Sequence, residues 1–163
     1  MTSLSDSLVK QLLQGRYIAS FASHPPDGSI HVVAVWYLFD GASVYVATSS
    51  RSRKARNAHS NPHVSLMIDA RDADKSRGTN IAGTARILTG EASQQWNGRL
   101  HRKYLSEAAL ADPRVGAVFA AMDDVTIQIT PVSVISWDMR EVDRQFLGGA
   151  IASNPAYLLA LER

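Results

Sequence analysis

The sequence predicts a mainly β protein in which six antiparallel strands close into a barrel and carry a helical insert. Short apolar stretches with alternating polar residues recur along the chain. Turn signals such as Asp40-Gly41 separate neighbouring stretches, as they do in antiparallel hairpins. Helical patterns do not alternate regularly with the strands, which argues against a parallel dinucleotide-binding fold, and barrel closure removes exposed strand edges.

The first elements follow from local signals. A short amphipathic helix opens the chain, with Ser3 as its cap and Gly15 as its stop. A helix over residues 50–60 ends at Asn61-Pro62, because proline disfavours helical backbone in the residue before it. Around that helix, four strands are expected over residues 16–23, 30–39, 43–48 and 63–69.

The second half begins with a fifth strand over residues 79–88 and then becomes helical. Trp96, Leu100 and Tyr104 recur at helical spacing, and Asp112-Pro113 is typical of a cap followed by the first residue of a second helix.

The last strand is expected over residues 125–137, with a bulge at Pro131. We expect residues 1–143 to form the barrel domain. Residues 144–163 would form a tail, with a short helix that starts at Asn154-Pro155.

Composition narrows the classes of function. A length of 163 residues suits one domain, and the absence of cysteine excludes disulfides and thiolate sites. The start of the chain does not resemble a signal peptide, and no apolar stretch approaches the ~20 residues that span a bilayer. The cytoplasm is therefore the expected location, and no membrane partner is expected.

The most informative local feature is the run from Thr48 to Lys54, Thr-Ser-Ser-Arg-Ser-Arg-Lys. It lies where a strand is expected to end and a helix to begin. Hydroxyl donors come first and cations follow, and the first helical amides add partial positive charge, so the run suits a terminal phosphate. The alternative is a solvated basic helix with a serine cap.

Longer motifs resemble a known family. Val35 to Asp40, Arg53 to Asn57 and Asn61 to Asp69 look like the pyridoxamine-phosphate-oxidase-like split-barrel flavoproteins, and they are most similar to the flavin/deazaflavin oxidoreductase branch. Two later stretches, Gly83 to Arg86 and Val134 to Trp137, resemble that family's later strands.

The resemblance implies a six-stranded split barrel and a homodimer, with FMN or the deazaflavin coenzyme F-420 bound at the subunit interface. It assigns the phosphate to Thr48, Ser49, Ser50, Arg53 and Lys54. The strands that border the cofactor ring would contribute the remaining positions, His31, Val33, Trp36, Asn80 and Ile81. Trp96, Arg99 and Arg102 would come from the helical insert of either subunit.

A flavin-type ring itself carries hydride chemistry, so the expected function is an oxidoreductase acting on a small organic substrate, with no dedicated catalytic residue. The alternative is a non-catalytic haem- or flavin-binding module on the same barrel. The alternative role for Trp36 is packing in the hydrophobic core.

No metal site is expected from the five histidines. A nucleic-acid-binding barrel is disfavoured because no aromatic residue interrupts the basic stretch.

Overall fold

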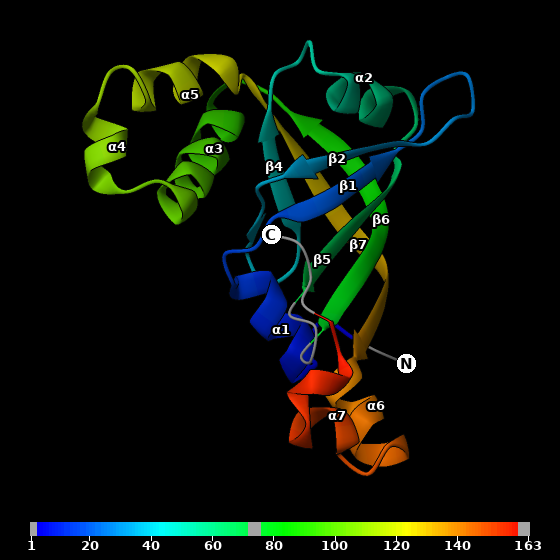
Figure 1. Cartoon of the computed structure of the whole chain (residues 1–163). Coiled ribbons are helices and arrows are strands. Elements are labelled where there is room, and N and C mark those ends of the chain that lie inside the picture. Colours follow the sequence, from blue (N-terminus) through cyan, green and yellow to red (C-terminus); the bar gives the residue numbers. More distant parts are fainter. Residues whose placement is uncertain (1–2, 72–75, 160–163) are drawn as a thin grey trace.

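The computed structural model describes residues 3–71 and 76–159 (Figure 1). The described part contains one antiparallel sheet of seven strands in the order β2-β1-β5-β6-β7-β4-β3. The strands are β1 (Ala19–Ser23), β2 (His31–Val35), β3 (Leu38–Phe39), β4 (Val44–Thr48), β5 (His63–Ala70), β6 (Arg77–Leu88) and β7 (Val125–Asp138). The antiparallel, mainly β prediction is confirmed.

The count of six strands was wrong, because the segment over residues 30–39 forms two strands. Its first half, β2, pairs with β1, and its second half, β3, pairs with β4. Trp36 and Tyr37 form the corner between them. Tyr37 is fully buried, and its hydroxyl donates to the backbone oxygens of Leu12 and Gly15, so it fixes the bend against the first helix. The two edge strands of the sheet are thus joined by only two residues.

The expected bulge in the last strand is confirmed. Gly83 of β6 lies opposite Pro131 and Ala82 lies opposite Ser133, so Val132 is an extra residue in β7. A side chain at Gly83 would begin 2.5 Å from the Thr130 oxygen, which explains glycine at this position.

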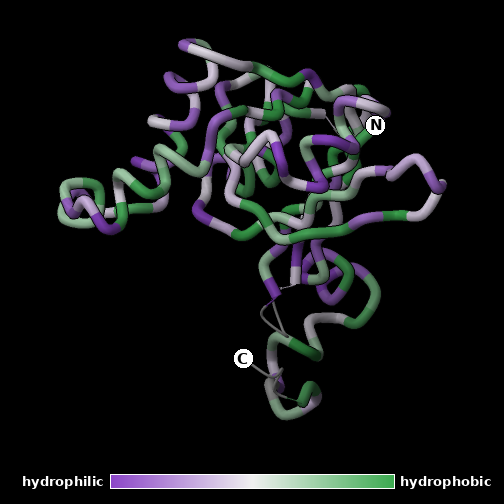
Figure 2. Tube along the Cα trace, turned by 90° about the horizontal axis from the view of Figure 1, so that it is seen from above, coloured by the Kyte–Doolittle hydropathy of each residue, from purple (hydrophilic) through white to green (hydrophobic). Residues whose placement is uncertain are grey.

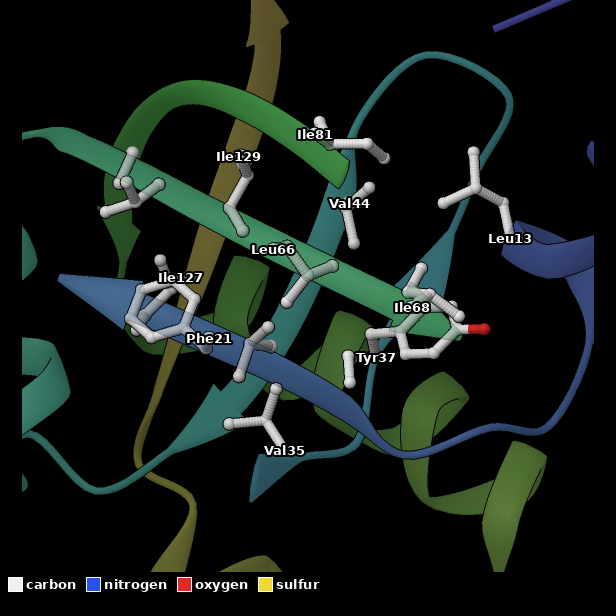
Figure 3. Packing of buried hydrophobic residues seen from close by; sticks show 14 of the residues in the cluster. Leu13, Phe21, Val35, Tyr37, Val44, Leu66, Ile68, Ile81, Ile127 and Ile129 are labelled. Carbon is white, nitrogen blue, oxygen red and sulfur yellow. The ribbon is translucent and has the colours of Figure 1, made fainter. Parts of the chain in front are cut away.

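The hydrophobic core fills the inside of the curved sheet (Figure 3). Phe21, Leu66 and Ile81 lie side by side on β1, β5 and β6, and Ile127 and Ile129 of β7 face them; all five are fully buried. Helix α1 (Ser7–Gln14) completes this core with Val9, Leu12 and Leu13. It starts later than predicted, with Asp6 rather than Ser3 at its N-cap, whereas Gly15 ends it as expected.

The helical insert consists of α3 (Gly90–Tyr104), α4 (Glu107–Ala111) and α5 (Gly116–Met122), which lie to one side of the sheet in both views (Figure 1 and Figure 2). A buried polar cluster attaches α3 to β7. There Thr126 donates to Asn97, whose amide donates to the backbone oxygen of Asp123. The second predicted helix begins at Gly116 rather than directly after Asp112-Pro113.

The remaining helices are α2 (Arg53–Ser60), α6 (Met139–Phe146), α7 (Ala150–Ser153) and the 3-10 turn η1 (Pro155–Tyr157). Helix α2 ends before Asn61-Pro62 as predicted. Helix α6 was not predicted, and it spans the expected boundary between residue 143, the end of the barrel domain, and residue 144, the start of the tail. None of the helices in the described residues is long and apolar enough to cross a bilayer.

Candidate functional site

A cavity of about 310 Å³ opens where β2, β4 and α2 meet the helical insert. Its walls are largely apolar, and two charged side chains enter it. The lining residues are Ile18, Ala34, Val35, Trp36, Ala47, Lys54, Leu100, Phe119 and Asp123. A mostly apolar cavity with a few polar groups is the usual form of a small-molecule site.

Lys54 and Asp123 are the two charged groups in this cavity. Burial lowers the pKa of the half-buried Lys54, while the negative charge of Asp123 acts in the opposite direction. The Asp123 carboxylate is also hydrogen-bonded to the buried His101, whose Nε2 lies 2.8 Å from its Oδ2. Lys54 is therefore a cation at the edge of an apolar space, and one carboxylate of the chain faces it.

At the junction between β4 and α2, the strand ends at Thr48 as predicted, whereas the helix begins at Arg53 rather than at residue 50. Ser52 caps α2 by accepting from the backbone N–H of Ala55, and Thr48 donates to the Ser52 hydroxyl. Ser49 accepts from the backbone N–H of Arg51. The hydroxyl-rich run therefore shapes the turn that leads into the helix.

Ser50 donates two hydrogen bonds to a carboxylate of the same chain, that of Asp124. Its backbone N–H donates to Oδ1 of Asp124 at 2.6 Å, and its hydroxyl donates to Oδ2 of the same residue at 2.6 Å. These two bonds hold the pKa of the Asp124 carboxyl below its usual value. The donor set at this junction is therefore chemically suited to an oxyanion.

Trp36 forms part of the cavity wall and stacks on two rings of the insert. Its ring centroid lies 4.9 Å from that of Tyr104 and 5.3 Å from that of Phe119, with interplanar angles of 1° and 20°. The packing role that the sequence left open for Trp36 is thus present, and it ties the barrel corner to the insert.

The other predicted site residues are placed elsewhere. Arg53 is exposed and lines a separate surface cavity with Asp27 and Arg56. Val33 packs against the core, and Ile81 is fully buried in it. His31 is partly buried, and no hydrogen-bond partner of its Nδ1 is found among the described residues. Of the ten predicted positions, Lys54 and Trp36 line the 310 Å³ cavity described above, which we call the main cavity because it lies beside the β4–α2 junction.

Asn80 lies on the outer face of the sheet. The strand register places it in a row of side chains that runs across five strands and points away from the core. The members of this row are Ala34, Ser20, Met67, Asn80 and Ile135. Asn80 accepts a hydrogen bond from Ser65. Because Ala34 belongs to both the row and the main cavity, the outer face continues into the cavity.

The three insert residues that the resemblance assigned to the cofactor, Trp96, Arg99 and Arg102, do not line the cavity that contains Lys54. Trp96 stacks on Tyr45 of β4 with centroids 3.7 Å apart, and the Arg99 guanidinium lies 4.3 Å from the Trp96 ring centroid. Arg102 is exposed. These contacts attach α3 to the outside of β4.

Sequence reasoning missed Asp123, Asp124 and Phe119. Asp124 lies 74 residues beyond Ser50, to which it is bonded, and Asp123 directly precedes it, so no local pattern links the two aspartates to the junction. The one available signal was their place directly before the last strand, which pairs Val125 with Thr48 and so brings its first residues to the junction.

Comparisons with known proteins add to this geometry. Residues 6–138 match the family model described as "Pyridoxamine 5'-phosphate oxidase". A search of curated proteins finds no match.

Solved structures share the fold. A conserved hypothetical protein from Mycobacterium tuberculosis is 25% identical, with 86% of this chain and 88% of that chain covered and a TM-score of 0.70. A protein named F420 reductase is 24% identical, with 77% and 94% covered and a TM-score of 0.60. The haem storage protein HutZ from Vibrio cholerae is 17% identical, with 78% and 90% covered and a TM-score of 0.61.

Proposed function

The chain belongs to the pyridoxamine 5'-phosphate oxidase family, and from this premise we propose that it is an oxidoreductase that uses a bound flavin-type cofactor, FMN or coenzyme F-420. One observation carries the proposal. A half-buried cation, Lys54, stands at the edge of an apolar cavity walled by Trp36 and Phe119, next to a serine junction that holds an oxyanion. A phosphate joined to a flat ring combines the two chemistries that this arrangement offers.

Each part of the site has its own task in this proposal. Lys54 and the Ser50 donors bind the phosphate, and the apolar walls exclude water from the ring. When bound, the ring accepts or donates a hydride, and the protein orients it. The reductase named F420 reductase, which shares the fold, supports the deazaflavin as one of the two candidates.

We further propose that the active form is a homodimer with the cofactor at its interface. The outer face of the sheet bears small residues between exposed apolar ones; Val32 is 59% exposed and Ile135 is 62% exposed. A second copy on this face would cover them and would bring Asn80 close to the cavity mouth, since Ala34 belongs to both surfaces. Residues of the partner's insert would then be available to the ring, as the family resemblance implies.

The test is titration of the purified protein with FMN, coenzyme F-420 and haem, followed by absorption and native mass spectrometry. We expect one of the two phosphorylated cofactors to bind stoichiometrically and to accept electrons under anaerobic reduction. Binding of haem alone would favour the non-catalytic module instead. None of the described residues that line the cavity is a histidine, and His101 lies behind two lining residues, Asp123 and Phe119. Failure of both FMN and F-420 to bind would refute the oxidoreductase.

A further inference from the structure

Asp124 occupies donors that the proposed phosphate site would use. Its carboxylate takes both the backbone N–H and the hydroxyl of Ser50, the first residue after the hydroxyl pair Thr48 and Ser49. Next to it, Asp123 faces Lys54. Each of the two consecutive carboxylates therefore faces one donor of the junction: Asp124 faces Ser50, and Asp123 faces Lys54.

We propose that Asp124 is an internal competitor for this anion site: its carboxylate must leave Ser50 before a phosphate group can bind there. The inference rests on the proposed function for the identity of the cofactor, but not for the existence of the anion site. The competing ligand is any phosphate monoester or inorganic phosphate, whose extra charge and additional acceptor oxygens give it stronger hydrogen bonds than one carboxylate.

The competition is effective because Asp124 is tethered next to its target. The following residue, Val125, is paired with Thr48 in the sheet, so the carboxylate stays within reach of Ser50 whether or not it is bonded. A tethered group acts at a high effective concentration, and a free ligand must exceed this competition. Asp124 would thereby exclude weak anions and admit only those that bind well.

Displacement of Asp124 from Ser50 would also affect Phe119, which forms the opposite wall of the cavity. Asp123 and Asp124 directly follow α5, and Phe119 of α5 stacks on Trp36. None of the residues of α5 is fully buried, and besides this stack the helix packs on α3 and α4, where the Phe119 ring lies 5.5 Å from that of His101. Movement of the aspartates on phosphate binding would therefore shift Phe119, and this couples the phosphate end of the cavity to its ring end.

The test measures the affinity of inorganic phosphate by calorimetry for the wild type, Asp124→Asn and Asp124→Ala. Loss of one hydrogen-bonded charged competitor should raise phosphate affinity about tenfold, which corresponds to about 1.4 kcal/mol. Asp112→Asn is the matched control, because it removes the same charge from an exposed ion pair with Arg114 between α4 and α5 and should change affinity less than twofold. Thermal unfolding of each variant confirms that it is folded.

A mutant cycle separates direct competition from a general charge effect. In a Ser50→Ala background, Asp124→Asn should raise phosphate affinity less than threefold, because one of the shared donors is gone. Equal effects in both backgrounds, or no gain in folded Asp124 variants, would overturn the proposal. So would a lack of phosphate binding in all of them. A gain in phosphate affinity without binding of either flavin would support the competitor while it refutes the oxidoreductase.

Discussion

The hydroxyl of Tyr37 lies 2.5 Å from the backbone oxygen of Leu12, at the end of the first helix. This bond joins α1 to the corner at which β2 ends and β3 begins. Burial raises the pKa of Tyr37 far above its usual value, so the hydroxyl remains a donor throughout the working range of pH.

Tyr37→Phe should lower the free energy of unfolding by about 1–3 kcal/mol, because it leaves a buried carbonyl without its donor. Urea denaturation measures the change. Tyr157→Phe is the control, since that side chain is exposed, and it should be neutral. A neutral Tyr37→Phe would show that the corner is held by ring packing alone.

Lys54→Ala should weaken cofactor binding by about 1.5–3 kcal/mol, the range for a hydrogen bond to a charged group. Arg53→Ala should weaken it less, because the two neighbours line different cavities. Calorimetric titration of each variant with the cofactor that the wild type binds, repeated at higher salt, compares the two losses of affinity. If Arg53→Ala is the more damaging change, the phosphate lies on the exposed side of α2.

Phe119→Ala should loosen α5 without unfolding the barrel. The stack on Trp36 is worth about 0.5–1.5 kcal/mol beyond burial, so backbone hydrogen exchange in α5 should become about two- to tenfold faster. Exchange in β5 and β6 should not change. The neighbouring Val118→Ala is the control, since Val118 is 45% exposed. Equal exchange in the two variants would show that other contacts hold the helix.

Lys103 predicts a dependence of stability on pH. Burial lowers the pKa of its ammonium to about 8 in the folded protein, whereas the unfolded value is 10.5. Between these values the unfolded chain binds more protons, so the free energy of unfolding should rise with pH from about 8 to 10.5. The difference between the wild type and Lys103→Met should follow this rise in denaturation experiments.

Tyr37 and Tyr104 face Lys103, and burial raises the pKa of both, to about 12 for Tyr104, from an unfolded value of 10.0. Above about pH 10 the two tyrosines therefore lower the stability as pH rises, but they are present in both the wild type and Lys103→Met, so their effect cancels in the difference. A flat difference would have a specific meaning. It would show that the Tyr37 ring, 4.0 Å from the ammonium, and the Leu13 carbonyl offset the cost of burial.

Val32→Asp and Ile135→Asp should convert the proposed dimer into monomers, because each places a charge on the outer face of the sheet. Sedimentation velocity at micromolar protein, with cofactor present, measures the result. Tyr157→Asp puts the same charge on an exposed residue of the C-terminal turn η1 and should leave the dimer intact. A monomeric wild type would contradict the dimer itself.

Local patterns predicted much of the fold. Alternating polarity located the strands, and Asn61-Pro62 marked the end of α2. The split of residues 30–39 could not be predicted, because β-type residues continue through the corner. The contacts that hold the corner are long-range, from Tyr37 to α1 and from Trp36 to the insert. Helix α6 was missed although Asp138 and Glu141 have the spacing of a helix start, because the strand continues without a turn residue up to Asp138, which caps the helix.

The candidate site was predictable only in part, because some of its residues are brought together by contacts between distant parts of the chain. The strand-to-helix junction is local, so the hydroxyl and cation run located Lys54 correctly beside a cavity. The groups opposite it come from Phe119, Asp123 and Asp124, which reach the site through the pairing of β4 with β7. Long-range pairing is not encoded in any short stretch of sequence.

The extra residue Val132 has a consequence for how this chain tolerates changes in length. Side chains at Ile127 and Ile129 point inward, and after the extra residue Val134 is again the inward one. Deletion of Val132 alone would place Ser133 directly after Pro131, which matches the uninterrupted order of their partners Ala82 and Gly83 in β6. The rest of β7, including Ile135 and Trp137, would therefore keep its inner and outer faces, whereas deletion of any other single residue of this strand would exchange them. Related chains should therefore be able to lose one residue at this bulge, whereas changes in length elsewhere in the strand should come two residues at a time or fall in the turns.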